Sequence, residues 1–353
     1  NDMKILSILV IIQRSNGDVF LSSSLLNQLQ LNFNPKSIDL LVNNDTASIA
    51  KTLSNVRKIH TFSYDRKKNQ RWRQEINIIK KIYRKYDLSI NLTASDRSVL
   101  YACIASKYSI SAIEENNKKS WWKKLMLTKF YNFDTNKHII LNNLEPLAYL
   151  GVTSNNKQPI PSYSKDSESS INSKLLTLGI KNFIIFHPSA QYQYKIYPAD
   201  LRSKLLEMLN RLNLPIIVTG GVNKIDSMIK KEIPILSNVF NWIGETSIDE
   251  YIALSEKSLC YVGMDTLNMH IAASQNKPIF ALFGPTNLSM WAPWSNEVQS
   301  ATIENKPIQT YGNITIFQGD MPCVACGNAG CGGNGKSDCL EKIIPMKVFD
   351  SVR

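Results

Sequence analysis

The feature that most constrains the fold is a short apolar segment followed by an amphipathic one, a pattern that recurs along the chain. Residues 5–12 are almost entirely aliphatic and too few to cross a bilayer, so they predict a buried strand. Residues 19–31 follow with apolar side chains at helical spacing and predict a helix. Such alternation is typical of a parallel sheet with helical crossovers, so we expect an α/β fold. Because 353 residues exceed what one hydrophobic core usually holds, we also expect two domains.

A change in composition predicts where the two domains meet. Residues 153–173 are rich in Ser, Asn and Pro and poor in apolar side chains, which is typical of a linker. We therefore expect an N-terminal domain over residues 1–160, a linker over 161–180 and a C-terminal domain over 181–353. Further strands are expected at 38–42, 58–62, 88–92, 182–186, 215–219, 259–262 and 279–283, and further helices at 46–53, 66–85, 198–212, 226–231, 248–255 and 269–274.

The excess of positive over negative charge lies entirely in the first of these domains. The net charge is +12, and residues 1–160 carry 24 Lys and Arg against 12 Asp and Glu. The remaining residues carry 17 of each kind. The N-terminal domain is therefore expected to meet an anionic partner, such as a phosphorylated glycolipid, a membrane surface or a nucleic acid, the alternative being a solubilising surface. The basic residues gather in two segments, with Trp121 and Trp122 in the second: Arg66, Lys67, Lys68, Arg71 and Arg73, then Lys118, Lys119, Lys123 and Lys124.

A carboxylate stands where the first expected strand gives way to a helix. In an open α/β sheet this turn lies at the edge of the ligand crevice, where Asp18 can act as a base. The alternative is that Asp18 only caps the N-terminus of the helix.

Two segments of the C-terminal domain combine polar residues with an expected strand end. Ser189 follows a strand, and a polar loop with Lys195 leads from it to a helix, an arrangement that suits a phosphate. Asp265 follows another strand, and Thr266 and His270 are one helical turn apart, so both can face the same crevice. The alternatives to these binding roles are that Lys195 is a solvated surface lysine and that His270 is a buried residue of the core.

Four of the six cysteines fall within a short Gly-rich segment near the end of the sequence. Four close thiolates favour a tetrahedral zinc or iron site, while reduced thiols or disulfides are the alternative. The other two cysteines, Cys103 and Cys260, lie in apolar segments and are expected in the core. The candidate metal ligands are Cys323, Cys326, Cys331 and Cys339.

Taken together, these segments resemble the heptosyltransferases of glycosyltransferase family nine. The resemblance spans nearly the whole chain and depends on five motifs in combination. These are Gly17-Asp18-Val19, Tyr86-Asp87-Leu88-Ser89-Ile90-Asn91-Leu92, His187-Pro188-Ser189-Ala190 with Lys195, Gly263-Met264-Asp265-Thr266 with His270, and Phe283-Gly284-Pro285-Thr286 before Trp291-Ala292-Pro293-Trp294.

The resemblance implies an inverting, metal-independent glycosyltransferase of the GT-B type, with two Rossmann-like domains facing a central cleft. It implies transfer of a heptose from ADP-heptose to an inner-core sugar of lipopolysaccharide, and the motifs look most like those of enzymes that add a branch heptose. By the same resemblance, Asp18 matches the general base and Lys195 the residue that neutralises the diphosphate. The implied donor-binding residues are Ser189, Asp265, Thr266 and His270, and the expected acceptor-binding residues are Arg66, Lys67, Arg71, Lys123 and Lys124.

The expected partners are ADP-heptose, a phosphorylated lipid A and core acceptor, and the anionic surface of the membrane. The expected location is therefore cytoplasmic, on the cytosolic face of the bacterial inner membrane. No cofactor is expected in catalysis, and the cysteines are expected at most to hold a structural zinc or iron. One alternative is a protein heptosyltransferase of the autotransporter type with metal-bound cysteines. Another is a basic nucleic-acid-binding protein with a zinc knuckle, although the charge lies in the wrong half for that and no nucleic acid is expected.

Overall fold

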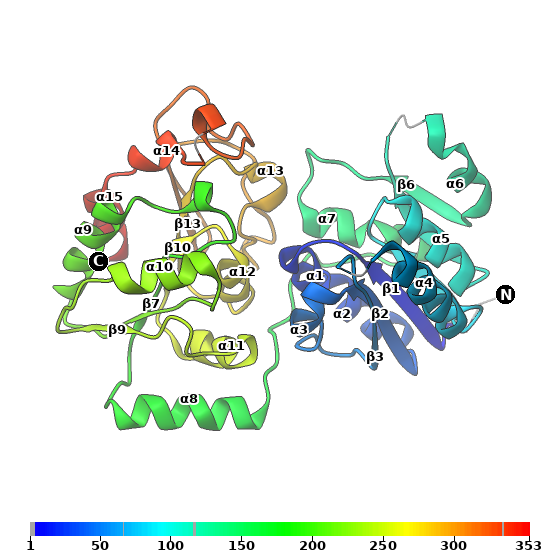
Figure 1. Cartoon of the computed structure of the whole chain (residues 1–353), viewed down its shortest axis with the longest axis horizontal. Helices are drawn as coiled ribbons and strands as arrows, with labels where there is room; N and C mark the ends of the chain where they lie inside the picture. Colours follow the sequence, from blue (N-terminus) through cyan, green and yellow to red (C-terminus); the bar gives the residue numbers. More distant parts are fainter. Residues whose placement is uncertain (1–3, 66, 116–117, 334) are drawn as a thin grey trace. The chain divides into compact units, whose positions relative to one another are not determined.

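The computed structural model describes residues 4–65, 67–115, 118–333 and 335–353, and it divides into two compact units (Figure 1). Unit 1 is Asn1–Pro159 and unit 2 is Ile160–Arg353. Each has a central sheet of mainly parallel strands with helices between them, so the predicted α/β fold is confirmed. In the described part of the chain, no helix is both long and apolar enough to cross a membrane.

The segment expected as a linker is partly helical. Helix α8 (Lys165–Thr177) begins at Ser164, whose hydroxyl accepts a hydrogen bond from the Ser167 backbone N–H at 3.1 Å. The helix packs on α11 and buries Ile171 and Leu175. Because its remaining side chains are mostly polar, its composition resembles that of a linker, and the structure differs here from the expected boundaries of 161–180.

The strand order of unit 1 places its first strand beside its fourth. The sheet runs β3-β2-β1-β4-β5-β6, and all the pairs are parallel. The order reverses between β1 and β4, which in doubly wound sheets opens a crevice at the carboxyl ends of the strands. The strands are β1 (Ser7–Ile12), β2 (Ser37–Asn43), β3 (Lys58–Phe62), β4 (Leu88–Asn91), β5 (Ser109–Ile113) and β6 (Lys129–Asn132). The α-helices are α1 (Asn16–Leu21), α2 (Ser23–Phe33), α3 (Ala47–Ala50), α4 (Lys68–Ile82), α5 (Asp96–Ala105), α6 (Trp121–Met126) and α7 (Ile139–Leu144).

Both faces of the unit 1 sheet are covered, which is why β1 is apolar along almost its whole length. Alternate residues of β1, Leu9 and Ile11, pack with Ile78 of α4 and Tyr101 of α5. The strand residues between them point to the other face and are also buried. Burial on both sides fixes β1 in the centre of the sheet, so the loop that follows it has a rigid base.

Unit 2 has a similar sheet with one strand more. Its sheet runs β12-β13-β11-β10-β7-β8-β9, and the reversal of order falls between β7 and β10. Only the β12 and β13 pair among the described strands is antiparallel. The strands are β7 (Ile184–His187), β8 (Ile216–Val218), β9 (Val239–Asn241), β10 (Tyr261–Met264), β11 (Ile279–Phe283), β12 (Ile308–Tyr311) and β13 (Ile314–Gln318). The helices besides α8 are α9 (Ala199–Asn210), α10 (Lys224–Glu232), α11 (Ile248–Lys257), α12 (Leu267–Ser274), α13 (Leu288–Trp291), α14 (Asp338–Glu341) and α15 (Pro345–Val352).

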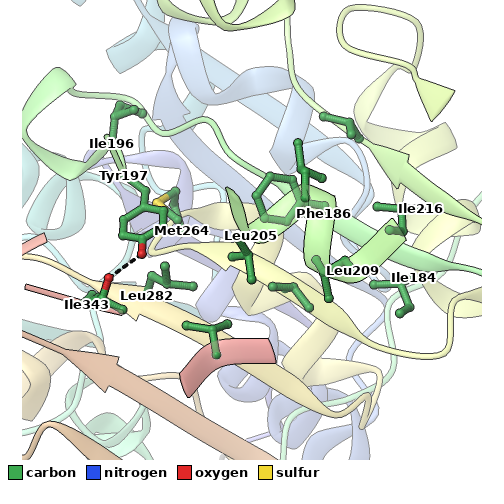
Figure 2. Packing of buried hydrophobic residues seen from close by; sticks show 14 of the residues in the cluster. Ile184, Phe186, Ile196, Tyr197, Leu205, Leu209, Ile216, Met264, Leu282 and Ile343 are labelled. Carbon is green, nitrogen blue, oxygen red and sulfur yellow. Dashed lines mark hydrogen bonds between the residues drawn. The ribbon is translucent and has the colours of Figure 1, made fainter. Parts of the chain in front are cut away.

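The core of unit 2 extends to the end of the loop that carries Lys195, just before α9. Ile196 and Tyr197 are buried in the same cluster as Met264 at the end of β10 (Figure 2). The Tyr197 hydroxyl donates a hydrogen bond to the Ile343 backbone carbonyl. A buried tyrosine with a satisfied hydroxyl is a rigid anchor. The residues next to Lys195 and Asp265 are therefore fixed in one core.

Replacing Gly263 with Ala is expected to lower the free energy of unfolding by about 1–3 kcal/mol, because overpacking a filled core forces the backbone to move. A Cβ at this position in β10 would lie 2.4 Å from the backbone oxygen of His187 on the neighbouring strand. Thermal unfolding measures the loss. Gly284→Ala is the matched control, because its Cβ would meet only the side chain of Leu340 closely, at 3.3 Å. Equal losses in the two variants would contradict this account of β10.

Candidate functional site

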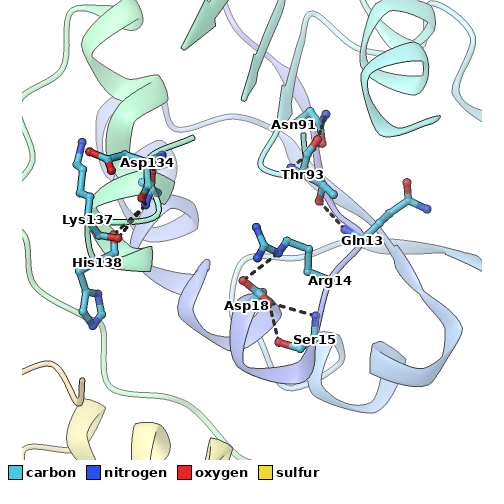
Figure 3. A network of polar contacts seen from close by, with 10 residues as sticks. Gln13, Arg14, Ser15, Asp18, Asn91, Thr93, Asp134, Lys137 and His138 are labelled. Carbon is cyan, nitrogen blue, oxygen red and sulfur yellow. Dashed lines mark hydrogen bonds and ion pairs between the residues drawn. The ribbon is translucent and has the colours of Figure 1, made fainter. Parts of the chain in front are cut away.

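In unit 1, polar side chains gather at the carboxyl ends of β1 and β4, where the strand order reverses (Figure 3). Asp18 lies in α1, shortly after β1, and Thr93 follows β4. The two loops are joined because the backbone N–H of Gln13 donates to the Thr93 hydroxyl at 2.9 Å. The sequence places Asp18 at this edge correctly.

The carboxylate of Asp18 uses its two oxygens differently. Oδ2 accepts hydrogen bonds from the Ser15 backbone N–H at 3.2 Å and from the Ser15 hydroxyl at 2.6 Å. These contacts form a capping box at the start of α1, so Asp18 does cap the N-terminus of this helix. Oδ1 is buried and accepts no hydrogen bond from any residue that the structure describes. This oxygen is thus available to a ligand.

Burial controls the charge of this carboxyl group. Asp18 is 4% exposed, and desolvation raises its pKa above the ordinary value, while Arg14 and the two hydrogen bonds from Ser15 act in the opposite direction. The Arg14 Nε lies 3.5 Å from Oδ1, and its guanidinium lies over the Phe133 ring at 4.8 Å from the centroid. The sequence analysis missed Arg14, although its position four residues before Asp18 is a signal that the sequence contains. A desolvated carboxylate beside an arginine is suited to accept a proton.

Replacing Arg14 with Met is expected to move the acidic limb of the pH profile of kcat/KM to higher pH. Activity rises as Asp18 loses its proton, and Arg14 lowers the pKa of Asp18, so its removal raises that pKa further. Arg14→Lys keeps a positive charge and should shift the limb less. The measurement is kcat/KM against pH for the three proteins. A limb that stays in place in Arg14→Met would contradict the role assigned to this ion pair.

The loop after β4 is built from a hydrogen-bonded set of small polar side chains. The Asn91 amide donates to the Thr93 carbonyl at 2.5 Å and to the Ser111 hydroxyl at 3.0 Å, and it accepts from the Thr93 N–H at 3.0 Å. The Ser98 hydroxyl donates to Gln13 Oε1 at 2.6 Å, and Gln13 Nε2 is buried with no hydrogen-bond partner among the described residues. This set fixes the floor of the unit 1 site, and Gln13 has a donor available for a ligand.

The basic candidates of unit 1 differ in their exposure. Lys67 is exposed just before α4, and Arg71 is half-buried and donates to the Tyr64 carbonyl at 2.5 Å. Lys124 is exposed on α6. Arg66 lies outside the described residues.

Lys123 does not lie on the exposed basic surface that the sequence predicts. Its side chain is 1% exposed, and its ammonium contacts the Ala94 carbonyl at 2.9 Å and the Asp96 carboxylate at 2.8 Å. These contacts stabilise the buried charge, and they hold α6 against the loop after β4. We therefore assign Lys123 a structural role and do not include it in the acceptor surface.

In unit 2, Lys195 and Asp265 meet at the corresponding switch point. Lys195 belongs to a short 3₁₀ helix, Gln193–Lys195, in the loop after β7, and Asp265 directly follows β10. The ammonium nitrogen lies 3.3 Å from the Asp265 Oδ2. Asp265 raises the pKa of Lys195, so the lysine is charged at neutral pH. The loop is also held by Ser337, whose hydroxyl donates to the Tyr194 carbonyl at 2.6 Å.

The other donor-site candidates lie beside this ion pair in the sequence and at the same strand ends. Ser189 is buried two residues after β7, and Thr266 is the residue before the first turn of α12. His270 is buried, its ring centroid is 6.4 Å from that of Trp291, and its Nδ1 has no hydrogen-bond partner among the described residues. Burial lowers the pKa of His270 to about 4, so this ring is neutral at pH 7. His270 is therefore a buried histidine, as the alternative interpretation has it. Its Nδ1 is still available for a further contact.

His187 is a second histidine at this edge of the sheet, and the sequence analysis did not assign it a function. His187 ends β7, and its Nδ1 shares a hydrogen bond of 2.8 Å with the Thr219 hydroxyl after β8. Burial lowers the pKa of His187 to about 4. A neutral, hydrogen-bonded ring can fix the ends of β7 and β8 beside the switch point.

The four clustered cysteines do not form a metal site in the part of the chain that the structure describes. Within residues 4–65, 67–115, 118–333 and 335–353, no group of three or more His, Cys, Asp or Glu side chains is arranged to hold a metal ion. Cys323 and Cys326 are exposed, whereas Cys339 is buried. Burial, together with the other three thiols, raises the pKa of Cys339 to about 11, so it is a thiol at neutral pH. The assignment of zinc or iron to these cysteines stays a prediction that elemental analysis of the purified protein can test.

The fold and the two sites define a class of protein. Two Rossmann-like units, each with polar residues at the switch point of its sheet, match the GT-B fold of solved heptosyltransferases. The chain belongs to glycosyltransferase family 9 (heptosyltransferase), whose sequence profile matches residues 76–316. It is therefore an enzyme of the glycosyltransferase class.

Individual relatives agree with this family in sequence and in fold. Lipopolysaccharide heptosyltransferase 3 of Escherichia coli K12 is 27% identical over 297 residues, which cover 81% of this chain and 84% of that protein. A family 9 glycosyl transferase from Veillonella parvula has a TM-score of 0.77 at 18% identity and covers 99% of this chain and 97% of its own. The E. coli ADP-heptose LPS heptosyltransferase II has a TM-score of 0.72 at 19% identity and covers 98% of this chain and 97% of its own.

Proposed function

We propose that this protein transfers a heptose from ADP-heptose to an inner-core sugar of lipopolysaccharide, with inversion at the anomeric carbon. Family membership and the names of its relatives support the sugar and the acceptor. The single observation that carries the mechanism is the buried Oδ1 of Asp18, which has no hydrogen bond at the edge of the basic unit.

In the proposed reaction, Asp18 Oδ1 takes the proton of an acceptor hydroxyl. The acceptor oxygen then forms a bond with the anomeric carbon as the bond from that carbon to the diphosphate oxygen breaks. ADP leaves with the electron pair. Because negative charge develops on the diphosphate, a cation at that point lowers the barrier, and we assign this role to Lys195.

Lys195 is held ready for this role by Asp265. The two groups form an ion pair, and Asp265 is 5% exposed. The start of α12 adds backbone N–H groups beside Asp265 and Thr266, a favourable position for phosphate oxygens. Ser189 and His270 complete the proposed donor site.

The acceptor is proposed to bind unit 1 through Lys67, Arg71 and Lys124, together with Arg66, which lies outside the described residues. Unit 1 has all the excess positive charge of the chain, which suits the phosphates of lipid A and the core. We propose that the enzyme works at the cytosolic face of the bacterial inner membrane, because such an acceptor is held there.

The two alternatives are not favoured. A protein heptosyltransferase with a metal-bound cysteine cluster has no support from the arrangement of the cysteines, and the relative from E. coli K12 is named for lipopolysaccharide. A nucleic-acid-binding protein does not account for membership of a glycosyltransferase family.

The test is transfer from ADP-heptose to a lipopolysaccharide core isolated from a strain that lacks its branch heptose. We expect the product to gain one heptose by mass spectrometry, and NMR of the new linkage to show inversion. GDP-mannose and UDP-glucose are the control donors, and an assay with EDTA tests the expectation that catalysis uses no metal. Transfer from a control donor, with none from ADP-heptose, would overturn the assigned donor.

A further inference from the structure

Large apolar side chains are exposed on α6 and the adjoining edge strand β6. Trp121 and Leu125 are 66% and 76% exposed, and they lie one helical turn apart on the same face of α6. Met126 is 52% exposed, and Phe130 on β6 is 38% exposed. Apolar side chains of this size, gathered within ten residues of sequence, mark an interaction surface.

The opposite face of α6 fixes the direction in which these side chains point. Trp122 packs against the buried cluster that includes Val99 and Leu127. Lys123 adds its ion pair with Asp96 and its hydrogen bond to the Ala94 carbonyl. Because Trp122 and Lys123 anchor one face of α6, the helix cannot turn to bury Trp121 and Leu125 within unit 1.

Lysines are interleaved with the exposed apolar side chains. The segment from residue 118 to residue 132 contains five lysines and no Asp or Glu. Four of them, Lys118, Lys119, Lys124 and Lys129, are exposed, and the Lys124 ammonium lies 5.6 Å from the centre of the Phe130 ring. Asp96 is 72% exposed but is paired with Lys123. The surface is thus both apolar and strongly positive.

We propose that this surface, formed by α6 and β6, docks the enzyme on an anionic phospholipid bilayer. Trp121, Leu125, Met126 and Phe130 would enter the headgroup region, where Trp is preferred, and the lysines would reach the lipid phosphates. A protein partner is a poorer match, because the centres of protein interfaces are depleted in lysine. The proposal rests on the proposed function, since a lipid-linked acceptor lies in such a bilayer.

Vesicle sedimentation tests the docking directly. Vesicles of phosphatidylethanolamine and phosphatidylglycerol are expected to bind the protein, and phosphatidylcholine vesicles to bind it weakly. Leu125→Ser/Met126→Ser should lower the binding constant about tenfold or more, because two inserted side chains are lost. Lys118→Glu/Lys129→Glu should lower it at least as much, since each lysine near an anionic bilayer contributes about fivefold. Leu176→Ser on α8 of unit 2 is the matched control, because Leu176 is 82% exposed but has only two lysines, Lys174 and Lys181, within five residues of it in sequence.

Two results would overturn the proposal. One is an absence of binding to vesicles that contain phosphatidylglycerol. In that case, light scattering would measure the oligomeric state and show whether a second copy of the chain covers this surface. The other is unchanged binding in both double variants. Thermal unfolding of each variant shows that a loss of binding does not come from a loss of folding.

Activity on two acceptors separates this proposal from the proposed function. Leu125→Ser/Met126→Ser should act normally on a core oligosaccharide freed of its acyl chains and more slowly on the same core in vesicles. A wild-type protein that binds vesicles but heptosylates neither acceptor would overturn the proposed function and leave the docking intact. Equal slowing on both acceptors would instead overturn the docking role.

Discussion

Asp18→Asn is expected to lower kcat by about a thousandfold, because positioned general bases contribute about 10²–10⁴ in rate. Asn keeps the shape of the side chain, and its amide oxygen can still accept the hydrogen bonds from Ser15, but the NH2 group then takes the place of Oδ1 and cannot accept a proton from a hydroxyl. Binding of ADP should be unchanged, since the proposed donor site lies in unit 2. Initial rates with saturating donor and acceptor, together with calorimetric titration of ADP, measure both expectations.

The same substitution should not destabilise the protein. Burial raises the pKa of Asp18 in the folded state, so above that pKa the ionised carboxylate costs stability, and a neutral amide removes this cost. The melting temperature of Asp18→Asn at neutral pH should therefore equal or exceed that of the wild type. Asp87→Asn is the matched control, because Asp87 also accepts backbone hydrogen bonds, from Leu6 and Ser7, but at the amino ends of the strands. Retained turnover in Asp18→Asn, or an equal loss in Asp87→Asn, would contradict the assignment of the base.

Several strands were predictable from sequence because the sheet buries both of their faces, although β5 and β13, which are also buried along their whole length, were not among the expected strands. The expected strand 38–42 corresponds to β2, whose aliphatic run fits a buried parallel strand, and the expected strand 58–62 corresponds to the edge strand β3, which is only partly buried. The expected helix 19–31 is instead two helices that meet at Ser22, whose hydroxyl donates to the Val19 carbonyl at 2.6 Å. Apolar periodicity continues through that break and cannot show it. The edge strand β9 was missed because its three residues are only half-buried and lack a long apolar run.

For the sites, the sequence identified which residue types stand at strand ends but not which residues meet. The turn after β1 indicates Asp18, whereas Phe133, which follows β6, reaches Arg14 only because β6 folds into the same sheet. Lys123 is the opposite case. In sequence it cannot be told from the exposed Lys124, and only the position of Asp96 in the fold shows that Lys123 is buried. Pairings between distant segments depend on topology, which local patterns do not encode.

Lys195→Ala is expected to lower kcat/KM for the donor by about 10²–10³, the usual loss when one group that stabilises developing charge is removed. The ammonium is the partner that the structure gives to the Asp265 carboxylate, which is almost fully buried. Without Lys195, this carboxylate would repel the diphosphate as well as lack a partner. The loss therefore has two parts, an attraction that is removed and a repulsion that is exposed.

A double-variant cycle separates the two parts. Lys195→Ala/Asp265→Asn should bind ADP more tightly than Lys195→Ala alone, because the repulsion is gone, yet more weakly than the wild type. Titration with AMP, which lacks the second phosphate, should show a smaller difference between wild type and Lys195→Ala than titration with ADP. Lys204→Ala on α9 is the matched control, because Lys204 is exposed and should leave both affinities unchanged. If the four proteins bind ADP equally, Lys195 does not face the diphosphate. If AMP is affected as strongly as ADP, the lysine contacts the nucleoside or its first phosphate, and the leaving group must be neutralised by another cation.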